Sequence, residues 1–367
     1  MKIKKISLKN YRNCENVELF FPANKTLIIG KNAQGKTNIL ESIFFLSDLK
    51  SPRTSSVGDL MRFNKSLFEI NACIEKNNTE IELDFIYTSD KKREMKVNNL
   101  KTTAKNFKSV VKTVLFSTKD MLLLRGAPED RRNWLDRAIS QIYPAYDERL
   151  SKYEKIRIQK NNLLKNDVID NSLYDIYNEQ LVITGANIIF LRKKFLKEIE
   201  KIAKEKHSII SENEEFSINY SCPKDEVSEI CEYLKQELVE RRQEEFARRQ
   251  SCVGPHRDDI TFNINNIDAS KFASQGQQRT IVLSLKLSEL ELIKEKTGYY
   301  PILLLDDVLA ELDDRRQNYL LKSINENTQT IITSVDTVLF EEEFLKDVTI
   351  YNVENGSIKP NIKGNCL

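Results

Sequence analysis

The pattern of apolar and polar positions predicts β-strands in the first 29 residues. Ile6 and Leu8 alternate with polar neighbours, and Val17, Leu19 and Phe21 do the same. Residues 26–29 form a short apolar run, which is typical of a buried strand. Similar patterns predict further strands at 67–74, 80–87, 94–97, 111–116, 260–264, 302–306 and 330–334.

Apolar residues three and four positions apart predict helices in two other regions. Residues 38–49 show this spacing directly after the first buried run. Residues 129–251 are highly charged and poor in Gly and Pro, and apolar stripes recur along them, among them Leu150, Tyr153 and Ile156, then Ile188, Phe195, Ile199 and Ile202, and Val227, Ile230, Cys231, Leu234 and Leu238. We interpret these stripes as the packed faces of amphipathic helices.

Changes in composition and in hydrophobic pattern divide the chain into three segments. Residues 1–128 are expected to form the first part of a head, with a mixed sheet and an antiparallel β lobe. Residues 129–251 are expected to form an inserted helical arm that resembles a coiled coil. Residues 252–367 return to strand and loop patterns and complete the head. The predicted fold class is therefore α/β with an inserted helical domain.

Composition narrows the class of protein. The 367 residues are 40% hydrophobic and 31% charged, as expected for a soluble globular chain. No apolar run approaches the roughly 18 residues of a membrane span, and no apolar signal region follows Met1 to Lys5, so we expect a cytoplasmic protein. Only two histidines are present, and no C-x-x-C pair occurs among the six cysteines, which argues against a zinc site or a disulfide framework. The cysteines are Cys14, Cys73, Cys222, Cys231, Cys252 and Cys366.

Positive charge is concentrated near the N-terminus. Residues 1–128 hold 23 lysines and arginines against 13 aspartates and glutamates. Basic residues cluster between 91 and 112, namely Lys91, Lys92, Arg93, Lys96, Lys101, Lys105, Lys108 and Lys112. Such a surface suits a phosphate backbone, but lysines also protect exposed strand edges from pairing. Both interpretations stay open at this point.

Residues 30–37 fit the pattern G-x-x-x-x-G-K-[ST], with a predicted strand before them and a predicted helix after them. Backbone N–H groups of such a loop point at phosphate oxygens, and the following helix adds the positive end of its dipole. Lys36 is expected to reach the β- and γ-phosphates, and Thr37 to ligate Mg²⁺. The predicted nucleotide-binding residues here are Gly30, Lys31, Asn32, Ala33, Gln34, Gly35, Lys36, Thr37 and Asn38. The alternative is a chance match in a surface turn.

A late apolar strand ends in two carboxylates, Asp306 and Asp307. Asp306 would hold Mg²⁺ together with Thr37, and Asp307 would orient or deprotonate the attacking water. The alternative is an acidic turn after a core strand. With both motifs present, we expect ATP and Mg²⁺ as cofactors and Lys36, Asp306 and Asp307 among the catalytic residues.

Residues 274–278 place a Ser and a Gly at the start of a predicted helix, which is a second potential anion site. A second site is redundant if one molecule encloses one nucleotide, but it makes sense if it completes the γ-phosphate site of another subunit. Ser274, Gly276 and Gln277 are therefore predicted to bind nucleotide, and Ser274 also to act in catalysis.

These motifs resemble the RecF family, in the SMC-like branch of the ABC-type ATPases. Residues 274–278 are similar to the ABC signature, and Glu311 to Asp313 match its D-loop. The full resemblance rests on residues 10–13, 30–38, 122–128 with Arg131 and Arg132, 254–259, 274–280 and 303–313. It implies an ABC/SMC-like P-loop ATPase head with an inserted arm, and an ATP-dependent homodimer.

The resemblance also implies function. It implies DNA binding at gaps and at single-strand/double-strand junctions, slow DNA-dependent ATP hydrolysis, and cooperation with RecR and RecO in loading RecA. Arg53 lies where SMC-type heads place an arginine that senses nucleotide and DNA, although an exposed loop arginine explains it equally well. The segment 330–334 ends in Thr333 and Ser334 where ABC transporters have a histidine, and Asp307 stands where they have Glu.

Two other functions compete with this one. The ATP-hydrolysing subunit of a membrane transporter would need a surface that couples to membrane helices, and the inserted arm and Thr333 argue against it. A nucleotide or small-molecule kinase would have no use for residues 274–278. An arm of this length without a C-x-x-C hook also excludes a long SMC-style tether.

Overall fold

The computed structural model describes residues 1–211 and 214–361, so Cys366 lies outside the described residues. The chain separates into two compact units. Unit 1 contains residues 1–120 and the chain from residue 289 onward, and unit 2 contains residues 121–288. These boundaries divide the chain into parts that are each compact in space. They differ from the segment boundaries at 128 and 251, which the sequence pattern alone suggested. The three-segment division therefore stays a prediction.

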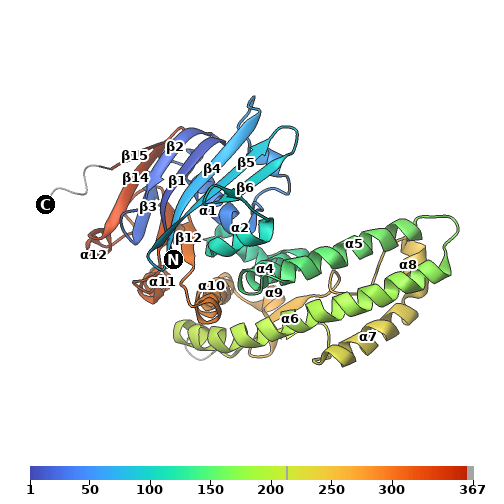
Figure 1. Ribbon diagram of the computed structural model, residues 1–367. Coiled ribbons are helices and arrows are strands. Elements are labelled where there is room, and N and C mark those ends of the chain that lie inside the picture. The colour runs from blue at the N-terminus through green and yellow to red at the C-terminus, as the bar shows by residue number, and fades with distance from the viewer. Residues whose placement is uncertain (212–213, 362–367) are drawn as a thin grey trace. The chain divides into compact units, whose positions relative to one another are not determined.

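An antiparallel six-stranded sheet in unit 1 forms the expected β lobe. Its strand order is β2-β1-β4-β5-β6-β7 (Figure 1). The turn between β4 and β5 uses Asn77 and Asn78 with φ of 52° and 58°, a backbone conformation that Asn tolerates. The two strands predicted at 67–74 and 80–87 thus pair as a hairpin. The bounds are β1 Lys2–Tyr11, β2 Cys14–Phe20, β4 Leu67–Lys76, β5 Thr79–Thr88, β6 Arg93–Val97 and β7 Leu100–Lys101.

The second sheet of unit 1 is mixed and has the order β15-β14-β3-β13-β12-β8. Its strands β8, β12, β13, β3 and β14 run parallel, and β15 pairs antiparallel at the edge. Because the carboxyl ends of parallel strands meet at one edge, the loop after β3 and the two acids at the end of β12 lie at the same edge of the sheet. The bounds are β3 Lys25–Ile29, β8 Thr113–Ser117, β12 Ile302–Asp306, β13 Thr330–Ser334, β14 Val348–Glu354 and β15 Ser357–Pro360.

Helix α1, Lys36–Asp48, packs into the core of unit 1. Its residues Ile39, Ile43 and Phe44 belong to the same buried cluster as Ile6 of β1 and Leu304 of β12. Burial of an apolar side chain of this size contributes about 2 kcal/mol, so α1 is held by both sheets. This packing fixes the helix start, and therefore the loop before it.

The remaining elements of unit 1 are short. Lys105 and Lys108, two members of the basic cluster, lie on helix α2, and their spacing of three fits one helix face. The bounds are α2 Ala104–Val110, α11 Asp314–Ser323, α12 Glu342–Leu345, and the 3₁₀ helices η1 Val57–Leu60, η2 Thr118–Met121 and η3 Leu309–Glu311, of which η2 ends at the first residue of unit 2.

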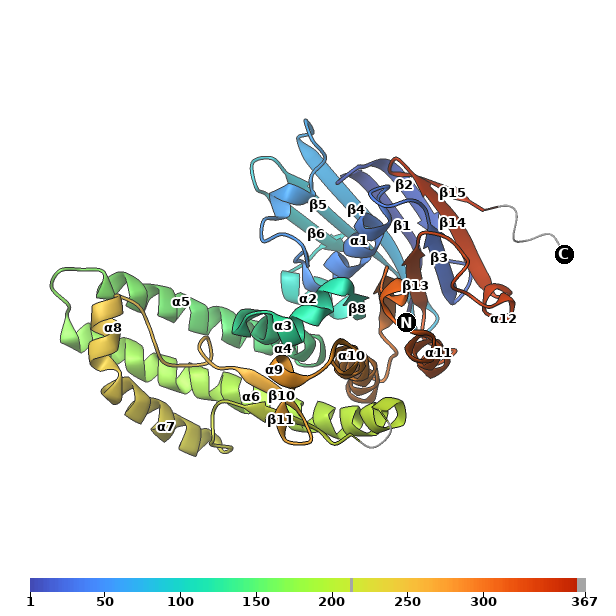
Figure 2. The same cartoon turned by 180° about the vertical axis from the view of Figure 1, so that it is seen from behind.

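Unit 2 is mostly helical, and α6 extends over 41 residues (Figures 1 and 2). Ala186 and Ile189 of α6 pack against Ile230 and Leu234 of α7, which confirms that the apolar stripes form core. The bounds are α3 Leu122–Arg125, α4 Pro128–Ile142, α5 Tyr146–Leu164, α6 Asn171–Ser211, α7 Val227–Glu240, α8 Arg242–Arg248, α9 Ala269–Phe272, α10 Gln275–Thr297, and strands β9 Phe216–Tyr220, β10 Ile260–Ile264 and β11 Ile267–Asp268. Helix α10 crosses from unit 2 into unit 1.

The segment 254–259 connects the helices of unit 2 to one another. Asp259 accepts two hydrogen bonds from Arg131 of α4, at 2.7 and 2.9 Å. His256 Nδ1 lies 2.6 Å from the hydroxyl of Tyr153 on α5, and burial lowers the pKa of His256 to about 3. A neutral, hydrogen-bonded histidine of this kind supports a packing role for the segment.

Candidate nucleotide-binding site

The P-loop joins β3 to α1, as the sequence predicts. Gly35 stands immediately before α1 with φ of 116°, in the region that favours glycine. A Cβ atom there would lie 2.8 Å from the amide of Asn13. Lys31, Asn32 and Ala33 are exposed on the loop, whereas Gln34 and Asn38 are half-buried. The motif therefore has the strand–loop–helix context that phosphate binding requires.

Lys36 lies folded back across the loop. Its Nζ donates to the carbonyl of Gly30 at 2.7 Å and lies 3.9 Å from Oδ1 of Asp307. The side chain is only 3% exposed. A phosphate oxygen would offer this ammonium group a stronger, charge-assisted partner than a carbonyl. The geometry is thus suited to an exchange of partners when nucleotide binds.

Thr37 and Asp306, the predicted magnesium ligands, are in direct contact. The Thr37 hydroxyl donates to Asp306 Oδ1 at 2.8 Å, across 269 residues of sequence. Burial raises the pKa of Asp306, although hydrogen bonds from Thr37 and Thr333 act in the opposite direction. A bound Mg²⁺ would compensate the buried negative charge.

The donor set fits Mg²⁺. This ion prefers oxygen ligands and usually keeps several waters beside one or two carboxylates and the phosphates of its nucleotide. Asp306 and Thr37 together offer one carboxylate and one hydroxyl. No group of three or more His, Cys, Asp or Glu residues suited to a metal occurs among residues 1–211 and 214–361. The remaining ligands would therefore come from phosphate and water.

Thr333 holds the two acids at the end of β12 in place. Strand register places it beside Asp306, and its hydroxyl donates to Asp306 Oδ1 at 3.0 Å and accepts from the backbone N–H of Asp307 at 2.9 Å. Sequence reasoning noted Thr333 only as a departure from the transporter histidine. Its function as a bridge depends on a strand neighbour that a linear sequence does not reveal.

Asp307 has the features of a residue held ready for a ligand. Its backbone is left-handed, with φ of 51°, and its buried Oδ1 has no hydrogen-bond partner within the described part of the chain. Strained and unsatisfied groups occur preferentially at functional sites. A water molecule positioned for attack on a γ-phosphate would satisfy this oxygen. The function of Asp307 stays a prediction with this geometric support.

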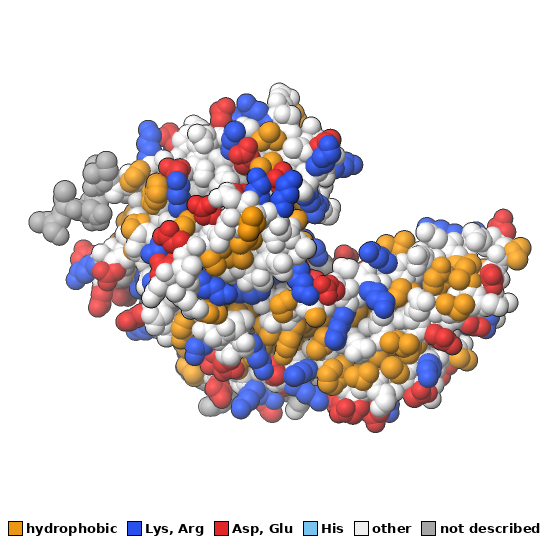
Figure 3. All heavy atoms as spheres, in the orientation of Figure 1, with side chains coloured by type: hydrophobic (Ala, Val, Ile, Leu, Met, Phe, Trp, Pro, Cys, Tyr) orange, Lys and Arg blue, Asp and Glu red, His pale blue; other side chains and the backbone are white. Residues whose placement is uncertain are grey.

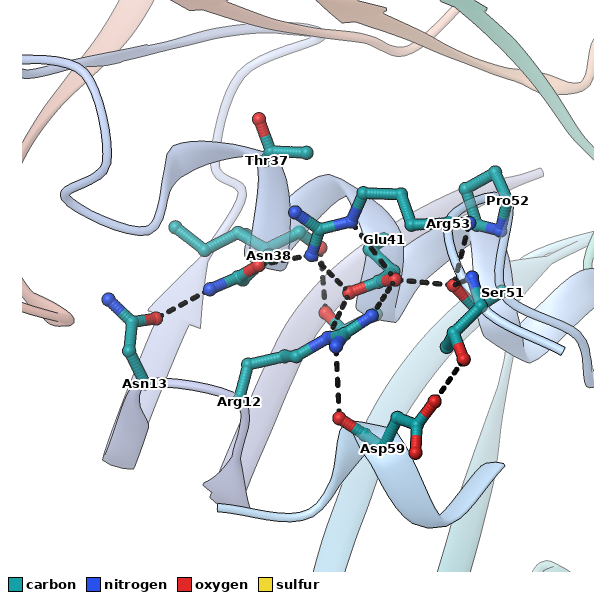
Figure 4. Close-up of polar contacts among 12 residues, drawn as sticks. Arg12, Asn13, Thr37, Asn38, Glu41, Ser51, Pro52, Arg53 and Asp59 are labelled. Carbon is teal, nitrogen blue, oxygen red and sulfur yellow. Dashed lines mark hydrogen bonds and ion pairs between the residues drawn. The ribbon is translucent and has the colours of Figure 1, made fainter. Parts of the chain in front are cut away.

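A buried carboxylate, Glu41, organises the arginines near the start of α1 (Figure 4). Arg12 donates to it through Nε and Nη2 at 2.9 and 2.8 Å, and Arg53 through Nη2 at 2.5 Å. The Ser51 hydroxyl donates a further bond at 2.5 Å. Arg53 also contacts the Asn38 side chain. The loop that carries Arg53 is thereby attached to the helix of the P-loop.

Two arginines share the carboxylate of Glu41, and Asp59 adds a second negative charge near Arg12. Burial alone raises the pKa of Glu41, but hydrogen bonds from Arg12, Arg53 and Ser51 outweigh it and lower the pKa to about 2. Sequence reasoning missed Glu41. Its signal was a single acid within the apolar run of α1, at a position that helical spacing turns inward. The cluster is suited to holding Arg53 for an anion.

Ser274 and Gln277 form a capping box at the start of α10 in unit 2. Ser274 Oγ accepts from the Gln277 N–H at 3.2 Å, and Gln277 Oε1 accepts from the Ser274 N–H at 2.8 Å. Gln277 Nε2 also donates to Glu214 at 2.7 Å. Gly276 lies in the first turn of the same helix. The sequence did not predict that both side chains cap the helix, and nucleotide contact by Ser274, Gly276 and Gln277 stays a prediction.

The fold and the P-loop constellation define an ABC/SMC-like P-loop ATPase head. The model of the RecF/RecN/SMC N-terminal domain family matches residues 2–359. Relatives described as DNA replication and repair protein RecF are 40% identical over 364 residues in Streptococcus gordonii and 43% identical over 369 residues in Streptococcus agalactiae serotype V. These matches cover 98% and 99% of this chain, and 100% and 99% of the relatives. The chain therefore belongs to the RecF family.

Solved structures agree with this assignment. A structure described as the recombination mediator protein RecF-ATPrS in the RecFOR pathway is 33% identical, with a TM-score of 0.91 and 98% coverage of both chains. An Smc head bound to a domain of ScpA, 15% identical with a TM-score of 0.56, supports the fold alone. In the described part of this chain, no helix has the length and apolar character needed to cross a membrane.

Proposed function

We propose that this protein is an ATP-dependent DNA-binding protein of repair and replication-fork maintenance, which ATP closes into a homodimer on DNA. The observation that carries the proposal is the contact between Thr37 and Asp306, with Lys36 and Asp307 beside them. A hydroxyl–carboxylate pair, an ammonium group and a carboxylate whose Oδ1 lacks a hydrogen bond within the described residues lie at one sheet edge, which supports the proposal. Relatives named for DNA replication and repair supply the biological context.

Each residue of this edge has a distinct task in the proposed reaction. Thr37 and Asp306 would hold Mg²⁺, which neutralises charge on the phosphates. Lys36 exchanges the Gly30 carbonyl for a phosphate oxygen. Asp307 Oδ1 accepts a proton or hydrogen bond from the attacking water. Aspartate is shorter than the glutamate of transporters, which favours slow hydrolysis and a switch over a motor.

The start of α10 would act on the nucleotide of a second copy. Gln275 and Gly276 are the first two residues of the helix, and the first N–H groups of a helix have no acceptor within it. Such amides, with the helix dipole, favour an anion. ATP that contacts both copies binds the closed dimer more tightly than the open one, and this difference drives closure.

DNA is the proposed polyanion, with gaps and single-strand/double-strand junctions as the preferred form. Figure 3 shows lysines and arginines over the β5–β6 end of unit 1, with acidic side chains among them. Lys92 pairs with Asp90 at 2.7 Å, and Lys96 and Lys101 lie 3.3 and 3.7 Å from Glu94. These exposed pairs are weak, so phosphates can compete for the lysines. RecR and RecO are the proposed protein partners.

The test compares Lys36→Ala with Lys50→Ala, a change of an exposed lysine just after the same helix. The first variant should lose ATP binding and ATP-dependent dimerisation in analytical ultracentrifugation, and the second should keep both. Binding of duplex, single-stranded and gapped DNA is measured with and without ATP at stated salt. A Lys36→Ala protein that dimerises normally with ATP would refute the proposal.

A further inference from the structure

The turn between β14 and β15 lies against the P-loop, although 321 residues separate the two in sequence. The backbone N–H of Asn355 donates to Gln34 Oε1 at 2.6 Å, and that of Gly356 donates to the Gln34 carbonyl at 2.9 Å. Figure 1 shows why they meet, because β14 is the direct neighbour of β3. The last strands of the fold therefore hold the middle of the loop.

A second turn, between β1 and β2, contacts the same residue. Asn13 Nδ2 donates to the Gln34 carbonyl at 2.9 Å, and Asn13 Oδ1 accepts from Asn38 Nδ2 at 2.7 Å (Figure 4). The Gln34 carbonyl thus receives two hydrogen bonds, one from each turn. Asn13 also links the loop to the first turn of α1, because Asn38 lies on that helix.

These bonds set the direction of a peptide plane. In a trans peptide the carbonyl and the next N–H point in opposite directions. Fixing the Gln34 carbonyl toward the two turns therefore points the Gly35 N–H away from them. Backbone N–H groups of this loop are the donors that cradle phosphate, so the orientation of this plane affects binding.

The start of the loop packs against the same hairpin. A Cβ atom at Gly30 would lie 2.4 Å from the carbonyl oxygen of Val353 on β14. A Cβ atom at Gly356 would lie 2.5 Å from the carbonyl oxygen of Asn13. The hairpin, the loop and the β1–β2 turn are thus in close contact, with no space for a side chain at either glycine.

We propose that Asn13 and the Asn355–Gly356 turn form a clamp that preorganises the P-loop for nucleotide. These are positioning residues, since they act through Gln34 and Gly35. The inference rests on the proposed function in one respect, namely that this loop binds ATP. It adds that ATP affinity depends on the C-terminal hairpin, which carries no motif of its own.

The test uses two glycines that share a backbone conformation and differ in surroundings. Gly356 has φ of 74° and Gly298 has φ of 78°, but a Cβ at Gly298 would meet nothing within 4 Å. Alanine at either position carries a similar backbone strain. Only Gly356→Ala should push Asn13 away from Gln34. We expect its Kd for ATP to rise by about tenfold over that of Gly298→Ala, as the loss of one to two hydrogen bonds implies.

Asn13→Ala removes the side-chain bonds without adding atoms, so it decides the question if Gly356→Ala does not fold. Its Kd for ATP should rise at least about threefold. Hydrogen exchange in nucleotide-free protein gives a readout without ATP, because both variants should speed exchange of the backbone N–H at position 356 and across residues 34–38. The proposal is overturned if both variants match Gly298→Ala in affinity and in exchange.

A Lys36→Ala control distinguishes failure of the proposed function from failure of the clamp. If wild type and Lys36→Ala bind ATP equally, the proposed function fails, and the exchange data still decide whether the clamp exists. If Lys36→Ala binds weakly while Gly356→Ala and Asn13→Ala bind like Gly298→Ala, the clamp fails and the proposed function stands.

Discussion

Substitution of Glu41 by Gln should strongly destabilise unit 1. The carboxylate is 2% exposed and accepts hydrogen bonds from Arg12, Arg53 and Ser51. Gln has nearly the same shape but no charge, so both guanidinium groups would keep their positions without a counter-ion. The Gln amide would also direct N–H donors toward the donors of the arginines.

The lowered pKa of Glu41 and the usual cost of breaking a buried ion pair both indicate the size of the effect. The pKa of Glu41 falls from 4.5 to about 2, and a shift of that size corresponds to about 3 kcal/mol of interaction between the charge and its surroundings. Breaking a buried ion pair by removing one partner typically costs about 3–5 kcal/mol. We therefore expect Glu41→Gln to lower the free energy of unfolding by about 3 kcal/mol at neutral pH.

The assay is urea unfolding with two probes. Far-UV circular dichroism reports the strands and helices of both units. Tryptophan fluorescence reports unit 2, because the only tryptophan, Trp134, lies there. Glu18→Gln is the control, because Glu18 pairs with Lys5 at 2.5 Å on the surface with half its side chain exposed. Such a pair contributes about 0–1 kcal/mol. Equal midpoints for the two variants would refute the reasoning.

The pH dependence gives an independent check. A carboxylate whose pKa is lower in the folded state contributes its full stability above its unfolded pKa, and loses it as pH falls through the folded value. For Glu41 this window runs from about pH 5 down to about pH 2. The stability difference between wild type and Glu41→Gln should therefore shrink across that window. A difference that stays constant would show that charge is not its cause.

Substitutions at three further residues test the site. Thr333→Val removes the bridge between Asp306 and the Asp307 N–H; it should cost about 1–2 kcal/mol of stability and slow hydrolysis, measured by phosphate release, and wild-type turnover would contradict this. Asp307→Asn should slow hydrolysis by at least about tenfold and prolong the ATP-bound dimer in ultracentrifugation; an unchanged rate would exclude Asp307 as the group that orients water. Ser274→Arg should bind ATP as a monomer but fail to dimerise, whereas Ser274→Ala should lose its cap, about 1 kcal/mol, together with the predicted contact of its hydroxyl with nucleotide; loss of ATP binding by the arginine variant would refute action on a second copy.

Local pattern predicted most of the secondary structure. Alternation located β4 and β5 within two residues, and the apolar runs at 302–306 and 330–334 coincide with β12 and β13. Strands with one buried face and helices with one buried stripe leave such periods in any sequence. The P-loop was predictable for a related reason, because its residues are adjacent and each has a fixed task in one compact turn.

Other parts of the site were not predictable, because they depend on neighbours far away in sequence. Glu41 gains its role only when two loops bring Arg12 and Arg53 to it. Thr333 becomes a bridge because β13 lies between β3 and β12. The basic residues Lys105 and Lys108 were assigned to a surface, but the short helix that carries them was not predicted.

The sequence by itself determined the class of this protein, since the P-loop and the strand ending in two acids are each readable within a few residues. The tertiary structure alone decided which groups support those motifs. The Gln34 carbonyl is oriented by Asn13 and Gly356, and Glu41 by two arginines, through hydrogen bonds that span up to 322 residues. The order of strands in the sheets determines which residues come into contact. That order follows from how the whole core packs.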